Sequence, residues 1–291
     1  MITGQNGQTT VAPLVVRRPQ WGALGLVPLL TLTLLSLPVL AGLAGTLAPA
    51  FGFSGLSLHQ SSSSAFLTLS EWPGLWRAAA LSFTTGLAST LLALLISLGL
   101  IATLSGGRLF ALMRRLLSPL LAVPHAAAAL GLAFLIAPSG WLSRILSPWV
   151  TGWSQPPDLL ILNDPWGISL TLGLVAKEVP FLLLMALAAL PQTQAATRAT
   201  LAASLGYGRV MGFALTTLPD HYRQLRLPLY AVLAYAMTAV EMAMILGPSL
   251  PPTLSVQITH WMMDPSLAQR GTAAAAALLQ IALVLAGLAT L

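Results

Sequence analysis

The chain has 291 residues, of which 56% are hydrophobic and 7% are charged, and its mean hydropathy is +0.84. A soluble domain carries about 25% charged residues and a disordered chain has few hydrophobic ones, so this composition excludes both classes. The net charge of +6 requires no nucleic acid, because Arg residues anchor cytoplasmic loops in membrane proteins, and the lack of cysteine excludes disulfides and thiolate chemistry.

Six apolar runs of membrane-spanning length follow one another along the chain. About 20 apolar residues in a helix cross a bilayer core, and such runs occupy 22–42, 78–103, 118–137, 166–190, 227–247 and 272–291. Residues 1–20 are polar and predict a cytoplasmic tail. The first run is too long for a signal peptide, so we expect it to be retained. The sequence therefore predicts an all-α integral membrane protein with about six transmembrane helices.

The positive charges indicate how these spans are oriented. Nine of the thirteen Lys and Arg residues fall on the side of the amino terminus, namely Arg17, Arg18, Arg108, Arg114, Arg115, Arg198, Arg209, Arg223 and Arg226. Arg77, Arg144 and Arg270 fall on the opposite side. Because cytoplasmic loops carry the excess of Lys and Arg, we expect both ends of the chain in the cytoplasm.

The segment 191–226, between the fourth and fifth runs, is not apolar enough to span and does not read as disordered. Residues 194–205 are rich in Ala and favour a helix. Gly206 and Gly208 predict a sharp turn after it, and a second short helix over 209–217 ends near Pro219. We expect a helix-turn-helix elbow at the cytoplasmic face, although an amphipathic helix on lipid headgroups would share this composition.

The spacing within this elbow resembles the EAA loop of permease subunits in binding-protein-dependent ABC importers, which have the MetI-like fold. That signature runs Glu-Ala-Ala, three residues, Gly, nine residues, Ile, one residue, Leu-Pro. Four positions match it, namely Ala202, Gly206, Leu218 and Pro219, whereas Thr200, Leu201 and Thr216 replace the Glu, the first Ala and the Ile. The segment Lys177 to Phe181 also resembles the stretch that precedes the loop in these permeases.

The resemblance implies a division of labour between chains. Residues 198–209 would be the coupling helix that docks in a groove of a separate ABC ATPase subunit, which holds the ATP and Mg and does the hydrolysis. No cofactor is then expected on this chain, which would not itself be an enzyme. A periplasmic solute-binding protein and a second permease half or subunit would be further partners, in a bacterial inner membrane. The residues implied in coupling are Arg198, Thr200, Leu201, Ala202, Leu205, Gly206, Arg209, Leu218 and Pro219.

YnjC-like permeases are the most similar group within this family. The stretches 124–141 and 241–248 resemble them in particular, and the whole resemblance covers about 75–291. Such permeases are often two fused six-span halves. Since the last apolar run reaches Leu291 without a basic anchor, we interpret 21–291 as one six-helix permease domain, either a fragment or the first half of a longer protein.

Three charged residues fall inside apolar runs, where each charge costs about 2.5–3.5 kcal/mol on insertion scales. They are Lys177, Glu178 and Glu241. They either line the solute pathway or form a structural ion pair, in which Lys177 would meet Glu178 or Glu241. A helix of small residues that ends in a glycine turn permits close approach to another protein's surface, so docking on the ATPase would make Gly206 intolerant of any side chain.

The four His residues show no metal-ligand spacing, so no metal site is expected. Lys177 is the only lysine and lies in a span, so the chain cannot form a Gly-Lys-Ser/Thr phosphate loop. Two alternatives to an ATP-driven permease stay open. One is a secondary transporter or channel that needs no ATP, and the other is an intramembrane protease.

Overall fold

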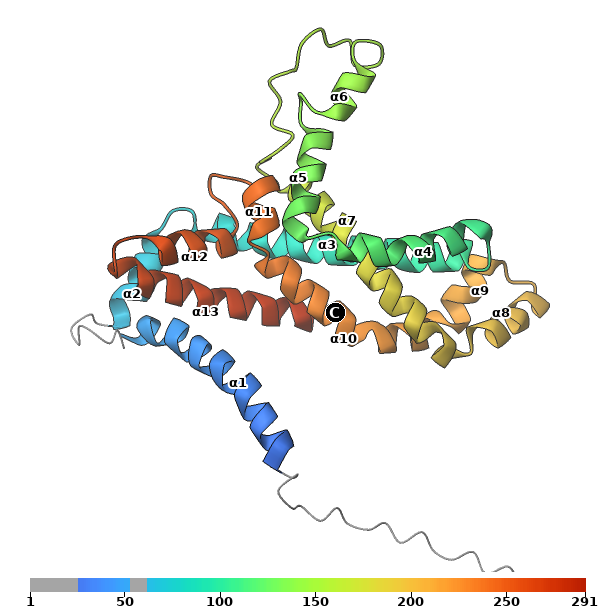
Figure 1. Ribbon diagram of the computed structural model, residues 1–291, viewed down its shortest axis with the longest axis horizontal. Coiled ribbons are helices and arrows are strands. Elements are labelled where there is room, and N and C mark those ends of the chain that lie inside the picture. Colours follow the sequence, from blue (N-terminus) through green and yellow to red (C-terminus); the bar gives the residue numbers. More distant parts are fainter. Residues whose placement is uncertain (1–25, 53–61) are drawn as a thin grey trace, which may run out of the picture. The chain divides into compact units, whose positions relative to one another are not determined.

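The computed structural model describes residues 26–52 and 62–291, and in these residues it contains helices and no strands (Figure 1). The all-α fold class is therefore confirmed for this part of the chain. The predicted tail 1–20, with Arg17 and Arg18, lies outside the described residues. The elements are α1 (Leu26–Leu47), η2 (Ala48–Phe51), α2 (Ser62–Glu71), α3 (Leu75–Leu104), α4 (Arg108–Ala122), α5 (His125–Ile136), α6 (Trp141–Leu146), α7 (Ile168–Ala189), η3 (Leu190–Thr193), α8 (Ala195–Ser204), α9 (Arg209–Thr216), α10 (Leu218–Thr238), α11 (Glu241–Leu246), α12 (Leu254–Met263) and α13 (Ala268–Ala289).

The helix α1, up to Thr46, forms one compact unit, and the chain from Leu47 onward forms the other. Alpha-helical backbone satisfies its own polar groups, which makes a helix the natural form for such a leucine-rich run in lipid. Its hydroxyls are also satisfied within the helix, because Thr31 and Thr33 donate to the carbonyls of Val27 and Leu29. The 22 residues of α1 extend about 33 Å at 1.5 Å per residue, enough to cross a bilayer core.

The core of the second unit is built on α3, which packs along α7 and α10 (Figure 1). Small side chains let these helices approach closely, as in other membrane bundles. Ser82, Thr85, Ser89, Thr90 and Ser97 of α3 are all buried. At Gly86 the approach is closest, since a Cβ added there would lie 2.9 Å from both the Cα and the N of Met237 in α10.

Five helices in the described residues are long and apolar enough to cross a membrane, one fewer than the six spans predicted. The difference lies at the fifth run. Residues 227–247 form the end of α10 and the separate α11, with a break between Thr238 and Glu241. The amino-terminal half of α10 carries Asp220, Arg223 and Arg226, which lowers its hydropathy. The third predicted run is also divided, because the chain leaves the helical conformation at Val123 before Pro124.

Asp164 fixes the start of α7. Its Oδ2 accepts hydrogen bonds from the backbone N–H groups of Trp166 and Ile168, at 3.2 and 2.8 Å, and its Oδ1 accepts from Ser169 N and Oγ, at 2.9 and 2.8 Å. Ser169 Oγ also lies 2.8 Å from the carbonyl of Leu246, which ties this helix start to the end of α11. A carboxylate at a helix amino terminus is stabilised by the unpaired N–H groups there.

The pKa of Asp164 predicts how stability depends on pH. Burial by itself raises the pKa of this carboxyl, but the hydrogen bonds from Ile168, Ser169 and Trp166 outweigh burial and lower the pKa below its usual 3.8. The charged cap therefore contributes stability above pH 3.8, and this contribution is lost as the pH falls through the lower folded pKa. We expect Asp164→Asn to cost about 1–3 kcal/mol at pH 7 and to remove this part of the acid sensitivity.

Thermal unfolding in detergent between pH 7 and pH 3 measures this effect. Asp158→Asn, in the same loop but outside the cap, is the matched control and is expected to unfold like the unmodified chain. An Asp164→Asn variant with an unchanged unfolding temperature at pH 7 would show that the cap does not stabilise α7.

Candidate functional site

The elbow predicted for 191–226 is present in the backbone. The helices α8 and α9 are separated by a tight turn in which Gly206 has a φ of +83°, a conformation that L-residues rarely adopt. The turn is closed by backbone hydrogen bonds from Gly206 to Ala203 and from Tyr207 to Ala202, both 3.0 Å long. The predicted helix limits thus differ from the observed ones by only one residue.

The close contact within the elbow is at Gly212, not at Gly206. A Cβ on Gly212 would lie 2.9 Å from the Cβ of Ala202, which is itself buried. No atom of residues 26–52 or 62–291 lies within 4 Å of a Cβ added to Gly206. Within the described residues the constraint on Gly206 is its positive φ, and its expected intolerance of a side chain at the contact with a partner stays a prediction. Ala202 holds the elbow together and offers no surface to a partner.

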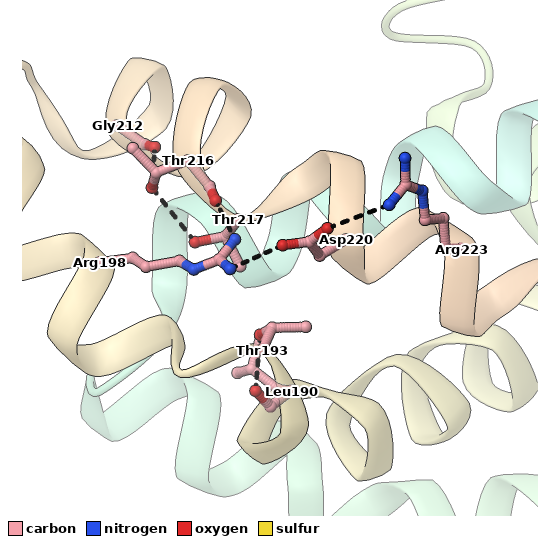
Figure 2. A network of polar contacts seen from close by, with 8 residues as sticks. All are labelled: Leu190, Thr193, Arg198, Gly212, Thr216, Thr217, Asp220 and Arg223. Carbon is pink, nitrogen blue, oxygen red and sulfur yellow. Dashed lines mark hydrogen bonds and ion pairs between the residues drawn. The ribbon is translucent and has the colours of Figure 1, made fainter.

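Arg198 points into the elbow and joins three helices (Figure 2). Its guanidinium donates a hydrogen bond to the carbonyl of Thr216 at the end of α9, and its Nη2 lies 2.6 Å from Oδ2 of Asp220 in the first turn of α10. A cation stabilises the carboxyl end of a helix and an anion stabilises the amino end. Arg198, on α8, therefore places its positive charge at the carboxyl end of α9 and pairs with the negative charge of Asp220 at the amino end of α10. Each charge has the sign that its helix end favours.

Further polar contacts connect the elbow to the bundle. Asp220 Oδ1 also lies 3.7 Å from Nη1 of the more exposed Arg223 (Figure 2). Arg209, at the start of α9, donates from Nη2 to Ser105 Oγ after the end of α3, over 3.0 Å. The elbow is thus attached to α10 through Arg198 and to α3 through Arg209.

The outer surface of the elbow is largely apolar. Of the residues predicted to contact an ATPase, Thr200, Leu201, Leu205, Gly206, Arg209 and Pro219 are exposed, while Arg198 and Leu218 are half-buried. Large apolar side chains that the sequence analysis did not select are exposed beside them, namely Tyr207, Val210, Met211 and Leu215. Their position on either side of the glycine turn could have identified them. Exposed apolar clusters of this kind mark surfaces that contact either a protein or a membrane.

The charged residues in the spans do not form the ion pair that we considered. Lys177 Nζ donates to the carbonyls of Leu120 and Val123, at 3.1 and 2.7 Å, where α4 ends. Glu178 accepts from Ser89 Oγ at 3.3 Å, and Glu241 is exposed at the start of α11. In the described residues, neither Glu lies within ion-pair distance of Lys177.

Apolar helices of membrane-spanning length, joined by a helix-turn-helix elbow, define an all-α integral membrane protein. No model of a known protein family matches the chain. Over 194 residues, or 67% of its length, the chain is 34% identical to the inner membrane ABC transporter permease protein YnjC of Escherichia coli (strain K12). The predicted resemblance to YnjC-like ABC permeases is thereby confirmed. The match covers 36% of YnjC, so the chain spans about a third of the length of this relative.

Proposed function

We propose that this chain is a transmembrane permease subunit of an ATP-driven ABC importer and moves a small solute across a bacterial inner membrane. The similarity to YnjC carries this proposal, since that protein is an inner membrane ABC transporter permease. The five candidate spans and the elbow that joins α7 to α10 are consistent with it. The excess of Arg on one side supports a cytoplasmic amino terminus.

The energy source in this proposal is another chain. The exposed apolar residues of α8 and α9 dock in a groove of an ABC ATPase subunit, which holds ATP and Mg. A periplasmic solute-binding protein delivers the solute to the opposite face, and a second permease half or subunit completes the pathway. Closure of the ATPase displaces the elbow, and the attachments of Arg198 and Arg209 pass this movement to α10 and α3.

Leu205 provides the direct test of docking. Its side chain is 67% exposed beside the turn, and burying a carboxylate in an apolar contact without a partner is costly. We expect Leu205→Asp to reduce at least tenfold the ABC ATPase that copurifies with the chain from membranes of its own cell, as measured by quantitative mass spectrometry.

Leu160→Asp is the matched control. Leu160 is 73% exposed but lies in the loop between α6 and α7, on the side opposite to the elbow in the predicted orientation. This variant should retain the ATPase. Equal copurification with both variants would contradict docking at the elbow, and solute movement by the purified chain without ATP would favour the secondary transporter or channel.

A further inference from the structure

A cavity of about 220 Å³ lies between the break from α4 to α5, the middle of α7 and the end of α10. Four polar residues line it, namely His125, Lys177, Glu178 and Tyr235, and the remaining lining is apolar. Ionisable residues at membrane depth are expensive and usually face a wet cavity or a partner. These groups differ in whether they already have a partner within the chain.

Lys177 has a structural role in this cavity. Pro124 has no N–H group and interrupts the series of backbone hydrogen bonds in the helix. Carbonyls at the end of α4 therefore lack their usual N–H donors. The ammonium group of Lys177 supplies donors to two of them, Leu120 O and Val123 O. Its positive charge thus lies against the negative end of a helix, which stabilises it.

One carboxyl oxygen of Glu178 has no hydrogen-bond partner in the described residues. One of its carboxylate oxygens, Oε1, accepts a hydrogen bond from Ser89, but Oε2 is buried and has no partner in the described residues. The side chain is only 4% exposed, and its neighbour Lys177 is not an ion-pair partner. A buried carboxylate is costly unless a donor or a cation meets it. In the described residues, Oε2 of Glu178 therefore lacks the cation or hydrogen-bond donor that would meet it.

Two aromatic rings form another part of the cavity lining. The rings of His125 and Tyr235 have centroids 4.7 Å apart and planes inclined at 48°. The face of a Tyr ring attracts ammonium groups within about 6 Å of its centroid. The unpartnered Oε2 of Glu178 and the ring of Tyr235 lie in one small cavity, whose lysine is already held by two carbonyls, and they are chemically complementary to an organic ammonium ion.

We propose that this cavity is a binding site for a small organic cation, with the ammonium group beside Glu178 and its alkyl part against His125 and Tyr235. The volume, below the 300–1,000 Å³ of typical drug-sized pockets, limits the ligand to a few heavy atoms. The proposed binding of a cation in this cavity is argued from the geometry alone. The further idea that the solute passes through this site during transport rests on the proposed function.

The test uses the full chain, purified in lipid nanodiscs without any ATPase. Radiolabelled choline is the probe, in a scintillation proximity assay with competition by ethylammonium chloride, sodium acetate and sodium chloride at equal ionic strength. We expect saturable choline binding that ethylammonium displaces and acetate does not. Glu178→Gln, which keeps the acceptor for Ser89, should weaken binding at least tenfold, and Tyr235→Ala should weaken it more than Tyr235→Phe.

Glu71→Gln, on the exposed end of α2, is the control and should bind choline like the unmodified chain. The thermal unfolding temperature of Glu178→Gln should not fall, because the variant keeps the acceptor for Ser89 and places a neutral amide where the carboxyl oxygen lacks a partner. Absence of saturable choline binding, displacement by acetate, or an unchanged affinity in Glu178→Gln would overturn the proposal. The binding test contains no ATPase, so its result does not depend on ATP-driven transport. If choline binds as expected but a separate assay with the complete transporter shows no ATP-driven uptake, only the proposed importer function is contradicted.

Discussion

Arg198→Asp is expected to uncouple ATP hydrolysis from solute uptake. The elbow is attached to the first turn of α10 through the guanidinium of Arg198, which meets both the Thr216 carbonyl and Asp220. The variant places a carboxylate against these two acceptors. Uptake into proteoliposomes that contain the complete transporter should fall at least tenfold, while the bound ATPase continues to hydrolyse ATP. The ratio of solute moved to ATP hydrolysed is the measurement.

Folding should be affected much less than coupling. The two partners are about one-third and two-fifths exposed, and ion pairs of that exposure contribute about 0–1 kcal/mol. The double variant Arg198→Asp with Asp220→Arg restores an ion pair of opposite polarity and should recover part of the lost uptake. Arg223→Asp is the control, because Arg223 is 75% exposed and lies farther from Asp220, at 3.7 Å. An Arg198→Asp variant with a normal ratio would refute transmission through this contact.

Gly86→Val is expected to destabilise the bundle strongly. A Cβ at this position would lie 2.4 Å from Met237 Cγ and 2.9 Å from two backbone atoms of Met237, and backbone cannot turn away as a side chain can. The variant must therefore separate α3 from α10. We expect a loss of about 3 kcal/mol, near the upper end of typical overpacking costs, and a correspondingly reduced yield of monodisperse protein in size-exclusion chromatography.

The same helix contains a matched control. Gly99, thirteen residues further along α3, has no atom within 4 Å of a Cβ added to it. Gly99→Val should therefore give a normal yield and an unfolding temperature close to that of the unmodified chain. If Gly86→Val and Gly99→Val behaved alike, the close packing of α3 on α10 would not be essential to the fold.

The elbow could be predicted from the sequence because its limits are set locally. Gly206, Gly208 and Pro219 restrict the backbone wherever they occur, so the turn and the end of the second helix follow from residue type. The orientation of Arg198 could not be predicted in this way. Its partner Asp220 lies two helices further along the chain, and only the angle of the turn brings the two side chains together.

In the spans, too, local sequence predicted the apolar helices, but it could not predict features that depend on tertiary contacts. Hydropathy identified the apolar runs, but it could not separate α10 from α11 or place the break before Pro124 within a continuous apolar stretch. The role of Lys177 depends on that break, because its carbonyl partners exist only where α4 ends. The cavity beside Glu178 likewise requires α5, α7 and α10 to converge, and residues far apart in sequence give no local signal of it.

The position of Lys177 also makes this residue a site at which chemical labelling can report movement of the helices. The chain has one lysine, and it is 8% exposed with its Nζ held by two carbonyls. Apart from the amino terminus, an amine-reactive ester therefore has a single target, which lies in the wall of the cavity. Acylation there should be slow while the carbonyls hold the ammonium group and faster whenever the break between α4 and α5 opens. Peptide mapping of that one modified residue then reports the opening of the bundle without any engineered label.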